Sequence, residues 1–268
     1  MTVDYAVRGS AAVITLDRDE RLNALTYPMI AAVQEAVMRA QQDPRIVGIV
    51  ITGAGRAFSA GLDMEALAQS AERGRAGPDD ARGTDELPAL FSYLLKVGKP
   101  VIAAVNGVAA GGGFVLAMMC DLRFVSEDAS LTTVFSRRGL IAEHGTSFIL
   151  PRMIGTSRAL DLLWSSERIG AAEAYRLGFA DRLVAKGKAV DEAVAYIDKL
   201  AATVSRRSLA VIKSQIYRHL SLSLTEAARD ADKLMWAALA HSDAKEGVAS
   251  FVERRAPRFA AFKGDADA

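Results

Sequence analysis

The residues with the clearest chemical potential are three consecutive glycines, Gly111-Gly112-Gly113, which follow a strongly apolar stretch. Glycines leave the backbone amides bare, and amides at the start of a helix can bind an oxyanion. The same glycines could instead serve packing, because a helix without side chains at these positions can approach a strand closely. Taken alone, the glycine run supports both interpretations.

Other motifs that carry chemistry are missing from the sequence. It contains no Gly-Lys-Ser/Thr of a phosphate-binding loop, and Phe58 occupies the third glycine position of a dinucleotide fingerprint that would begin at Gly53. Ser59 lacks the glycine two residues upstream that a nucleophile elbow requires. The three histidines have no metal-ligand spacing and there is one cysteine, so we expect no metal site.

Composition narrows the class of protein further. The 268 residues include 33 Lys and Arg against 32 Asp and Glu, a net charge of +1, which argues against a dedicated nucleic-acid binder. The single cysteine, Cys120, excludes an internal disulfide and suits a reducing compartment, so we expect a cytoplasmic protein. No apolar run follows Met1, which argues against a secretory signal.

The segment from residue 101 to residue 120 carries no charge, and its length alone would suit a membrane span. Pro100 precedes the run, however, and Asn106-Gly107 and the three glycines interrupt it. Val101–Val105 has the β-branched residues of a strand, and Leu116–Met119 suits a buried helix. The run therefore predicts a strand, a glycine-rich turn and a helix, and we expect no membrane association.

The elements around this unit predict an α/β body followed by helices. Strands are expected at Thr2–Arg8, Ala11–Asp17 and Ile46–Thr52, helices at Pro28–Gln42, Leu62–Gln69 and Glu86–Lys96, and loops at Gly53–Asp63 and Ser70–Asp85. Near the C-terminus four segments have helical spacing, at 189–204, 206–220, 223–240 and 243–255. We therefore predict a core of residues 1–188 and a C-terminal helical region of residues 189–268.

Four segments resemble motifs of the crotonase family, the enoyl-CoA hydratases and isomerases. They are Arg21–Leu25 (RLNAL), Arg56–Met64 (RAFSAGLDM), Lys99–Gly113 (KPVIAAVNGVAAGGG) and Phe251–Phe259 (FVERRAPRF). The resemblance covers nearly the whole chain. It implies an α/β fold, a crotonase spiral of stacked ββα units with two sheets and a C-terminal helical region. It also implies a homotrimer or a dimer of trimers, and a coenzyme A thioester as substrate, with no separate cofactor.

The resemblance further implies which residues form the site. The backbone N–H groups of Leu62 and Gly112 would hold the thioester oxygen, where two preorganised donors, each worth about 3 kcal/mol, stabilise an enolate. Contacts to coenzyme A are implied for Arg21, Leu22, Ala24, Ala60, Gly61 and Asp63. Asp63 could alternatively cap the helix that follows it. The loop Ser70–Asp85 is expected to shape the acyl pocket.

The catalytic carboxylates of a hydratase in this family are replaced here. The two positions that carry its glutamates correspond to Val115 and Phe135. Glu143 lies in a segment similar to the PE-x-x-S motif of single-glutamate Δ3,Δ2-enoyl-CoA isomerases, although Ala142 replaces the proline. One base that serves both proton transfers suits a buried carboxylate. Alternatively, Glu143 could satisfy free amides at a helix N-terminus.

His144 is a possible auxiliary group. It could point away from Glu143, orient its carboxylate, position a water or transfer a proton itself. The favoured function is isomerisation of 3-enoyl-CoA to 2-enoyl-CoA by Glu143. One alternative is an enoyl-CoA hydratase that adds water with Glu143 as acid and base. Another, of a different class, is a non-catalytic acyl-CoA binding protein.

Overall fold

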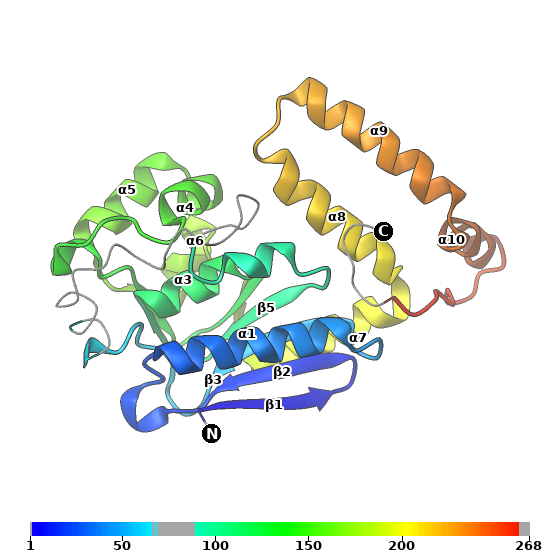
Figure 1. Ribbon diagram of the computed structural model, residues 1–268. Helices are drawn as coiled ribbons and strands as arrows, with labels where there is room; N and C mark the ends of the chain where they lie inside the picture. The colour runs from blue at the N-terminus through cyan, green and yellow to red at the C-terminus, as the bar shows by residue number, and fades with distance from the viewer. Residues whose placement is uncertain (1, 66–67, 69–88, 263–268) are drawn as a thin grey trace.

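The computed structural model describes residues 2–65, 68 and 89–262 (Figure 1). Within these residues the strands form two sheets. The large sheet has the order β1-β2-β3-β5-β7-β10 and the small one the order β4-β6-β8-β9. The first comprises Val3–Arg8, Ala11–Leu16, Gly48–Gly53, Val101–Val105, Leu122–Ser126 and Arg182–Val184; the second comprises Ala57–Ser59, Val108–Ala110, Ser130–Thr132 and Ile169–Gly170. Only the β1–β2 and β8–β9 pairs are antiparallel among these strands.

Helices alternate with these strands and then continue alone to the C-terminus. The α-helices are α1 (Tyr27–Gln42), α3 (Gly112–Met119), α4 (Thr146–Ile154), α5 (Thr156–Ser165), α6 (Ala171–Leu177), α7 (Ala189–Thr203), α8 (Arg206–His219), α9 (Leu224–Ala240) and α10 (Ser242–Val252). The described residues also contain three short 3-10 helices: η1 (Asp19–Arg21), η2 (Ser92–Lys96) and η3 (Ser136–Arg138). No helix in the described part of the chain is long and apolar enough to cross a membrane.

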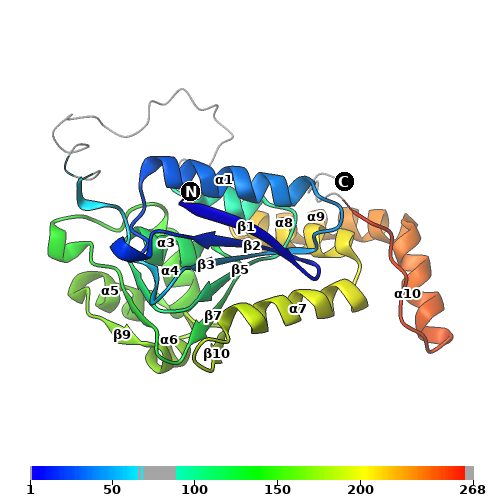
Figure 2. The same cartoon turned by 90° about the horizontal axis from the view of Figure 1, so that it is seen from below.

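The inner strands of the large sheet, β2, β3, β5 and β7, are buried because their side chains alternate between two hydrophobic clusters. In β2, Ala12, Ile14 and Leu16 join the cluster beneath α1 and α3, whereas Ala11 and Val13 join the cluster beneath α7. Figure 2 shows α1 and α7 on opposite sides of this sheet. The predicted division of the chain after residue 188 stays a prediction, although α7 itself packs on the sheet.

The sequence predictions for the core elements are confirmed, and two others are wrong. The expected hairpin and the strand at Val101–Val105 are present, and four helices, α7 to α10, lie in the described part of the chain after residue 188. Instead of an α-helix over Glu86–Lys96, the described part of that segment forms η2, because Phe91 has a left-handed φ of 62° that interrupts a helix. The expected loop at Gly53–Asp63 contains strand β4, which exists through its pairing with β6. The loop Ser70–Asp85 lies outside the described residues.

An ion pair fixes the C-terminal helices to the core. Asp121, the residue before β7, accepts hydrogen bonds from Lys213 Nζ at 2.7 Å, from Tyr217 Oη at 2.9 Å and from the backbone N–H of Val101 at 2.7 Å. Lys213 and Tyr217 are one turn apart on α8. Beyond this contact, α9 and α10 extend away from the sheets (Figure 1).

We expect Asp121→Ala to lower the free energy of unfolding by about 3–5 kcal/mol, because it leaves the ammonium of Lys213 buried without its partner. The midpoint of urea unfolding measures this loss. Glu173→Ala is the matched control, since it breaks the exposed Glu173–Arg176 pair and should leave the midpoint almost unchanged. Equal shifts for the two variants would contradict a structural role for Asp121.

Candidate active site

The two amides predicted to form the oxyanion hole lie next to each other. Leu62 follows β4, and Gly112 is the first residue of α3. A Cβ on Gly112 would lie 3.3 Å from the Leu62 nitrogen, and a Cβ on Gly61 would lie 3.1 Å from the Gly112 nitrogen. Within the described residues neither Leu62 nor Gly112 uses its N–H in a hydrogen bond to the protein. Both donors are therefore free to meet one oxygen.

The glycine run allows close packing of α3 on β4 and also leaves the Gly112 amide accessible beside Leu62. A Cβ on Gly113 would lie 2.3 Å from the backbone oxygen of Ser59, so only glycine allows α3 to approach β4 this closely. Gly111 precedes the helix with φ 49° and ψ −117°, a backbone conformation that side chains disfavour. The two interpretations of the glycine run thus concern different residues, with Gly113 at the contact and Gly112 beside Leu62.

The six residues predicted to contact coenzyme A lie on two adjacent segments. The segments are joined by backbone hydrogen bonds from Ala60 N to Leu22 O (2.9 Å), from Leu25 N to Gly61 O (2.7 Å) and from Asp63 N to Leu25 O (2.9 Å). They bring together Arg21, Leu22, Ala24, Ala60, Gly61 and Asp63. The side chain of Asp63 accepts from the N–H of Glu65 at 3.0 Å, so the prediction that it caps the following turn is confirmed.

Asn23 holds these two segments in place. Its side chain is fully buried and donates to the carbonyls of Ala54 (2.9 Å) and Ala57 (2.8 Å), while its Oδ1 accepts from the N–H of Arg18 (2.9 Å). Its φ of 55° is left-handed, a conformation that asparagine tolerates better than most residues. The resemblance included Asn23 in a motif without giving it this role.

We expect Asn23→Ala to lower the free energy of unfolding by about 3 kcal/mol, since three buried hydrogen bonds of about 1 kcal/mol each are lost. Asn23→Asp is the sharper comparison, because a carboxylate would face the oxygens of Ala54 and Ala57. The pKa of this carboxyl would be raised in the folded state, so the deficit relative to the wild type should shrink as the pH falls. Urea unfolding at pH 7 and pH 4.5 measures both effects. A deficit of Asn23→Asp that grows toward low pH would contradict this role.

Glu143 and His144 lie in the turn that precedes α4. The turn is closed by a hydrogen bond from Thr146 N to Glu143 O at 2.9 Å. The Glu143 side chain is 33% exposed, so the expectation of a buried carboxylate is wrong for the single chain. No side chain caps the N-terminus of α4, where Gly145 is the N-cap residue. The Glu143 carboxylate therefore does not bind the free amides at the start of α4, contrary to the alternative interpretation.

The imidazole of His144 faces Glu143. His144 Nε2 lies 3.7 Å from Glu143 Oε2, and Nδ1 accepts a hydrogen bond from the N–H of Leu90 at 3.5 Å. Burial lowers the pKa of His144, and the charge of Glu143 opposes that effect only in part. The orientation away from Glu143 that the sequence left open is not adopted.

The positions that carry glutamates in a hydratase of the resembled family are apolar and buried here. Val115 lies on α3 and Phe135 precedes η3, and both belong to the main hydrophobic cluster. The Glu143 turn approaches the other end of α3, where a Cβ on Gly145 would lie 3.2 Å from Met119 Cε. The turn that carries Glu143, the carboxylate predicted for the site, therefore lies at the Met119 end of α3, whereas Gly112 begins that helix.

Comparisons with known proteins decide the family. A model of the enoyl-CoA hydratase/isomerase family matches residues 7–262. The chain belongs to this family. It is 34% identical over 250 residues to a probable mitochondrial enoyl-CoA hydratase of Dictyostelium discoideum, covering 93% of this chain and 87% of the relative. It is 36% identical over 250 residues to a probable enoyl-CoA hydratase of Mycobacterium tuberculosis, covering 92% and 93%.

The fold agrees with this assignment. A probable enoyl-CoA hydratase/isomerase from Mycobacterium abscessus superposes with a TM-score of 0.85 at 29% sequence identity, over 97% of this chain and 99% of the other. The predicted crotonase fold is therefore confirmed. As a member of the enoyl-CoA hydratase/isomerase family, the protein acts on acyl-CoA thioesters.

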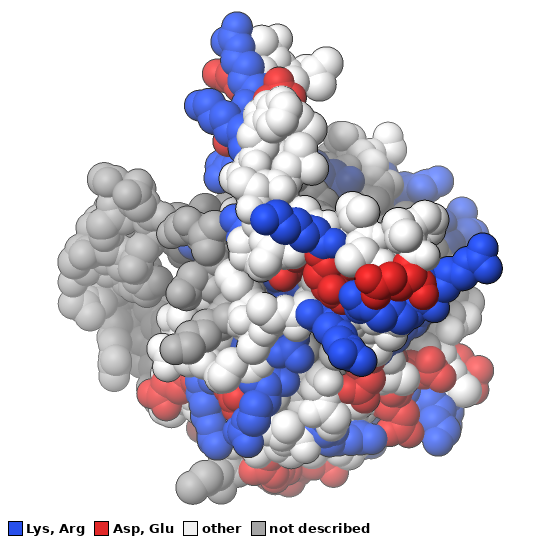
Figure 3. All heavy atoms as spheres, turned by 90° about the vertical axis from the view of Figure 1, so that its right-hand side faces the viewer, with Lys and Arg blue, Asp and Glu red and all other residues white. Residues whose placement is uncertain are grey.

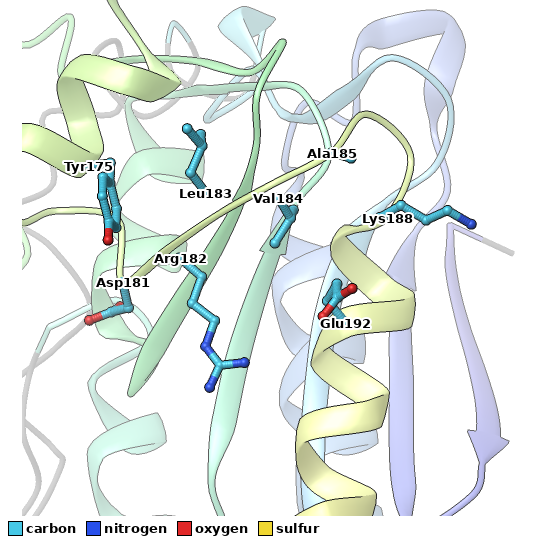
Figure 4. Close-up of a pocket in the computed structure, with 8 residues that line it drawn as sticks. All are labelled: Tyr175, Asp181, Arg182, Leu183, Val184, Ala185, Lys188 and Glu192. Atoms are coloured by element: carbon cyan, nitrogen blue, oxygen red, sulfur yellow. The ribbon is translucent and has the colours of Figure 1, made fainter.

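Within the described residues, two cavities have walls that include residues of α7 or α8. One of about 1000 Å³ lies between η2, the start of α4 and α8, and its walls include Met119, Gly145, Phe148 and Tyr217. The other, of about 540 Å³, lies where α6, β10 and α7 meet (Figure 4). The Arg182 side chain in that second pocket lies over the rings of Phe124 and Tyr196, 4.6 Å from each centroid. The first cavity shares Gly145 with the Glu143 turn, whereas none of the predicted site residues lines the second.

Two features of the site were missed by reading the sequence. Arg18 forms an ion pair with Asp63 at 2.7 Å, although it lies outside the family motif. The backbone of Leu90 reaches His144 across more than fifty residues of sequence, and no residue type signals a backbone contact. Among the described residues, no three His, Cys, Asp or Glu side chains are arranged to hold a metal ion.

Proposed function

We propose that the protein isomerises 3-enoyl-CoA thioesters to 2-enoyl-CoA thioesters with Glu143 as the single acid and base. The observation that carries this proposal is the replacement of both hydratase glutamates by buried apolar side chains, Val115 and Phe135. Neither side chain can activate or protonate a water. Glu143 supplies a carboxylate in their place. It directly precedes His144 and is partly exposed to solvent.

The reaction moves one proton and one double bond. The carboxylate of Glu143 removes a proton from C2, and the electron pair of that bond forms a dienolate whose charge rests on the thioester oxygen. The N–H groups of Leu62 and Gly112 donate to this oxygen and lower the barrier. The carboxylic acid of Glu143 then returns the proton to C4, which leaves the double bond between C2 and C3. No separate cofactor is needed.

Substrate binding is proposed to use the two adjacent segments around Leu22 and Gly61. Coenzyme A would contact Arg21, Leu22, Ala24, Ala60, Gly61 and Asp63, largely through the backbone. Because these segments are held by backbone hydrogen bonds and by Asn23, they are preorganised for a ligand. The proposed compartment is the cytoplasm.

A homotrimer or a dimer of trimers is the proposed assembly. Large apolar side chains are exposed along the C-terminal helices: Leu224, Met235, Trp236 and Leu239 on α9, and Val248, Phe251 and Val252 on α10. Figure 3 shows uncharged surface between charged groups on the face that carries these helices. Exposed apolar surface of this kind is typical of contacts between subunits.

The second candidate function is hydration of 2-enoyl-CoA by Glu143, and the names of the relatives favour it. Incubation of the purified protein with 2-enoyl-CoA and with 3-enoyl-CoA, each followed by mass-resolved product analysis, separates the two. We expect 2-enoyl-CoA from the 3-enoyl substrate and little 3-hydroxyacyl-CoA. Substantial 3-hydroxyacyl-CoA would refute the isomerase proposal. Tight acyl-CoA binding without turnover of either thioester would favour the non-catalytic alternative.

A further inference from the structure

His144 is held between two partners by an unusual backbone conformation. Its φ of 53° lies in the left-handed region, which few residues other than glycine adopt. Consecutive side chains in an extended chain point to opposite sides. In this left-handed turn, by contrast, the ring of His144 faces the side chain of the preceding residue, Glu143. The distance from His144 Nε2 to Glu143 Oε2 is 3.7 Å.

The partner on the other side of the ring decides where its proton lies. Nδ1 accepts the N–H of Leu90 at 3.5 Å, so Nδ1 carries no proton. Burial lowers the pKa of His144, which keeps the ring neutral at neutral pH. A neutral imidazole has one N–H, and with Nδ1 occupied as an acceptor that N–H is on Nε2. It therefore faces the carboxylate of Glu143.

This arrangement argues against a direct proton transfer between His144 and the substrate. One ring nitrogen accepts from the backbone and the other faces Glu143, so both nitrogens are directed at groups of the protein. The 3.7 Å separation is longer than a hydrogen bond. Contacts of this kind are often loose before substrate binds and tighten in the complex.

We propose that His144 is a positioning residue, whose Nε2–H holds the Glu143 carboxylate in the orientation that proton transfer requires, and that Leu90 selects the tautomer that makes this possible. The kinetic part of this proposal rests on the isomerase function proposed above. The tautomer and the contact with Glu143 do not depend on it. Leu90 directly precedes Phe91 and η2, so the segment entering η2 contributes to the site through its backbone.

Two variants separate the two contacts of the ring. His144→Gln places a carboxamide N–H where Nε2–H was, so it can still donate to Glu143. His144→Asn suits the left-handed backbone and can accept from Leu90, but it is too short to reach the carboxylate. Both variants keep a polar side chain of similar hydration, and thermal unfolding verifies that each is folded.

We expect His144→Asn to lower kcat for 3-enoyl-CoA by about 10- to 100-fold with KM within about threefold of the wild type, comparable to the loss when a partner that orients a metal ligand is removed. His144→Gln should retain kcat within about fivefold. A merely structural role would move both variants alike, so equal losses would overturn the proposal. A kcat within about twofold of the wild type for His144→Asn would overturn it as well.

A spectroscopic measurement tests the tautomer without relying on turnover. Nitrogen-15 resonances of the wild-type protein labelled at its three histidines, assigned by comparison with His144→Gln, report which ring nitrogen of His144 is protonated. We expect the neutral tautomer with the proton on Nε2 at pH 7.5, and a shift of the Nε2 resonance in Glu143→Gln. A proton on Nδ1 or a charged ring would overturn the proposal. If the wild type fails to isomerise 3-enoyl-CoA, the proposed function fails while this result still decides the role of Leu90.

Discussion

Glu143→Gln should lower the rate of 3-enoyl-CoA isomerisation by about 10²- to 10⁴-fold, the usual contribution of a general acid and base. Glutamine has nearly the same size and keeps an acceptor oxygen, but it cannot take a proton from C2 or return one to C4. Because the change leaves the amides of Leu62 and Gly112 untouched, acyl-CoA affinity should stay within about threefold of the wild type. Initial rates and isothermal titration with a saturated acyl-CoA measure the two quantities.

The matched control is Glu192→Gln on α7, an exposed glutamate at the second, distant pocket. It removes the same charge from the protein and should leave the rate unchanged. If Glu143→Gln also kept its rate within about tenfold of the wild type, the assignment of the base would be wrong. If it lost affinity in proportion to rate, Glu143 would be a binding residue instead.

Gly112→Ala should lower kcat/KM by about 10²- to 10³-fold, the loss typical of an oxyanion-hole donor. The added Cβ would lie 3.3 Å from the Leu62 nitrogen and 3.4 Å from Leu25 Cδ1. It would therefore occupy the space in which one oxygen can meet both N–H groups. Alanine favours helices more than glycine does, so the start of α3 should not be weakened.

Gly170→Ala is the control for this variant, since a Cβ there would meet nothing within 4 Å. It should retain full activity. Thermal unfolding of both variants shows whether any loss reflects folding. A Gly112→Ala enzyme with kcat/KM within about fivefold of the wild type would mean that the thioester oxygen sits elsewhere.

The parts of the fold that follow from local pattern could be predicted from the sequence. The β-branched residues of Val101–Val105 and the helical spacing from residue 189 onward identify elements that the structure contains. Strand β4 was missed because its three residues are a strand only through pairing with β6. The α-helix expected over Glu86–Lys96 is not formed in the described part of that segment, because Phe91 adopts a positive φ. No residue pattern predicts this backbone conformation.

The sequence predicts the part of the site in which glycines determine the backbone conformation. It does not predict the part that depends on contacts between residues far apart in the chain. Gly112 and Leu62 were placed by the motifs, and the structure brings them together. The exposure of Glu143 could not be predicted, since it depends on which segments cover the turn before α4. The contact between Leu90 and His144 joins two backbone regions that no spacing rule connects.

If one carboxylate carries the proton from C2 to C4, an isotope label that starts at C2 must reach C4 of the product. The wild-type protein is mixed in single turnover with 3-enoyl-CoA that carries deuterium at C2, and the product is analysed at early times. We expect 2-enoyl-CoA with part of the deuterium at C4, because Glu143 returns the deuteron that it removed. Absence of 2-enoyl-CoA, or a product whose C4 never carries deuterium at any time, would contradict it.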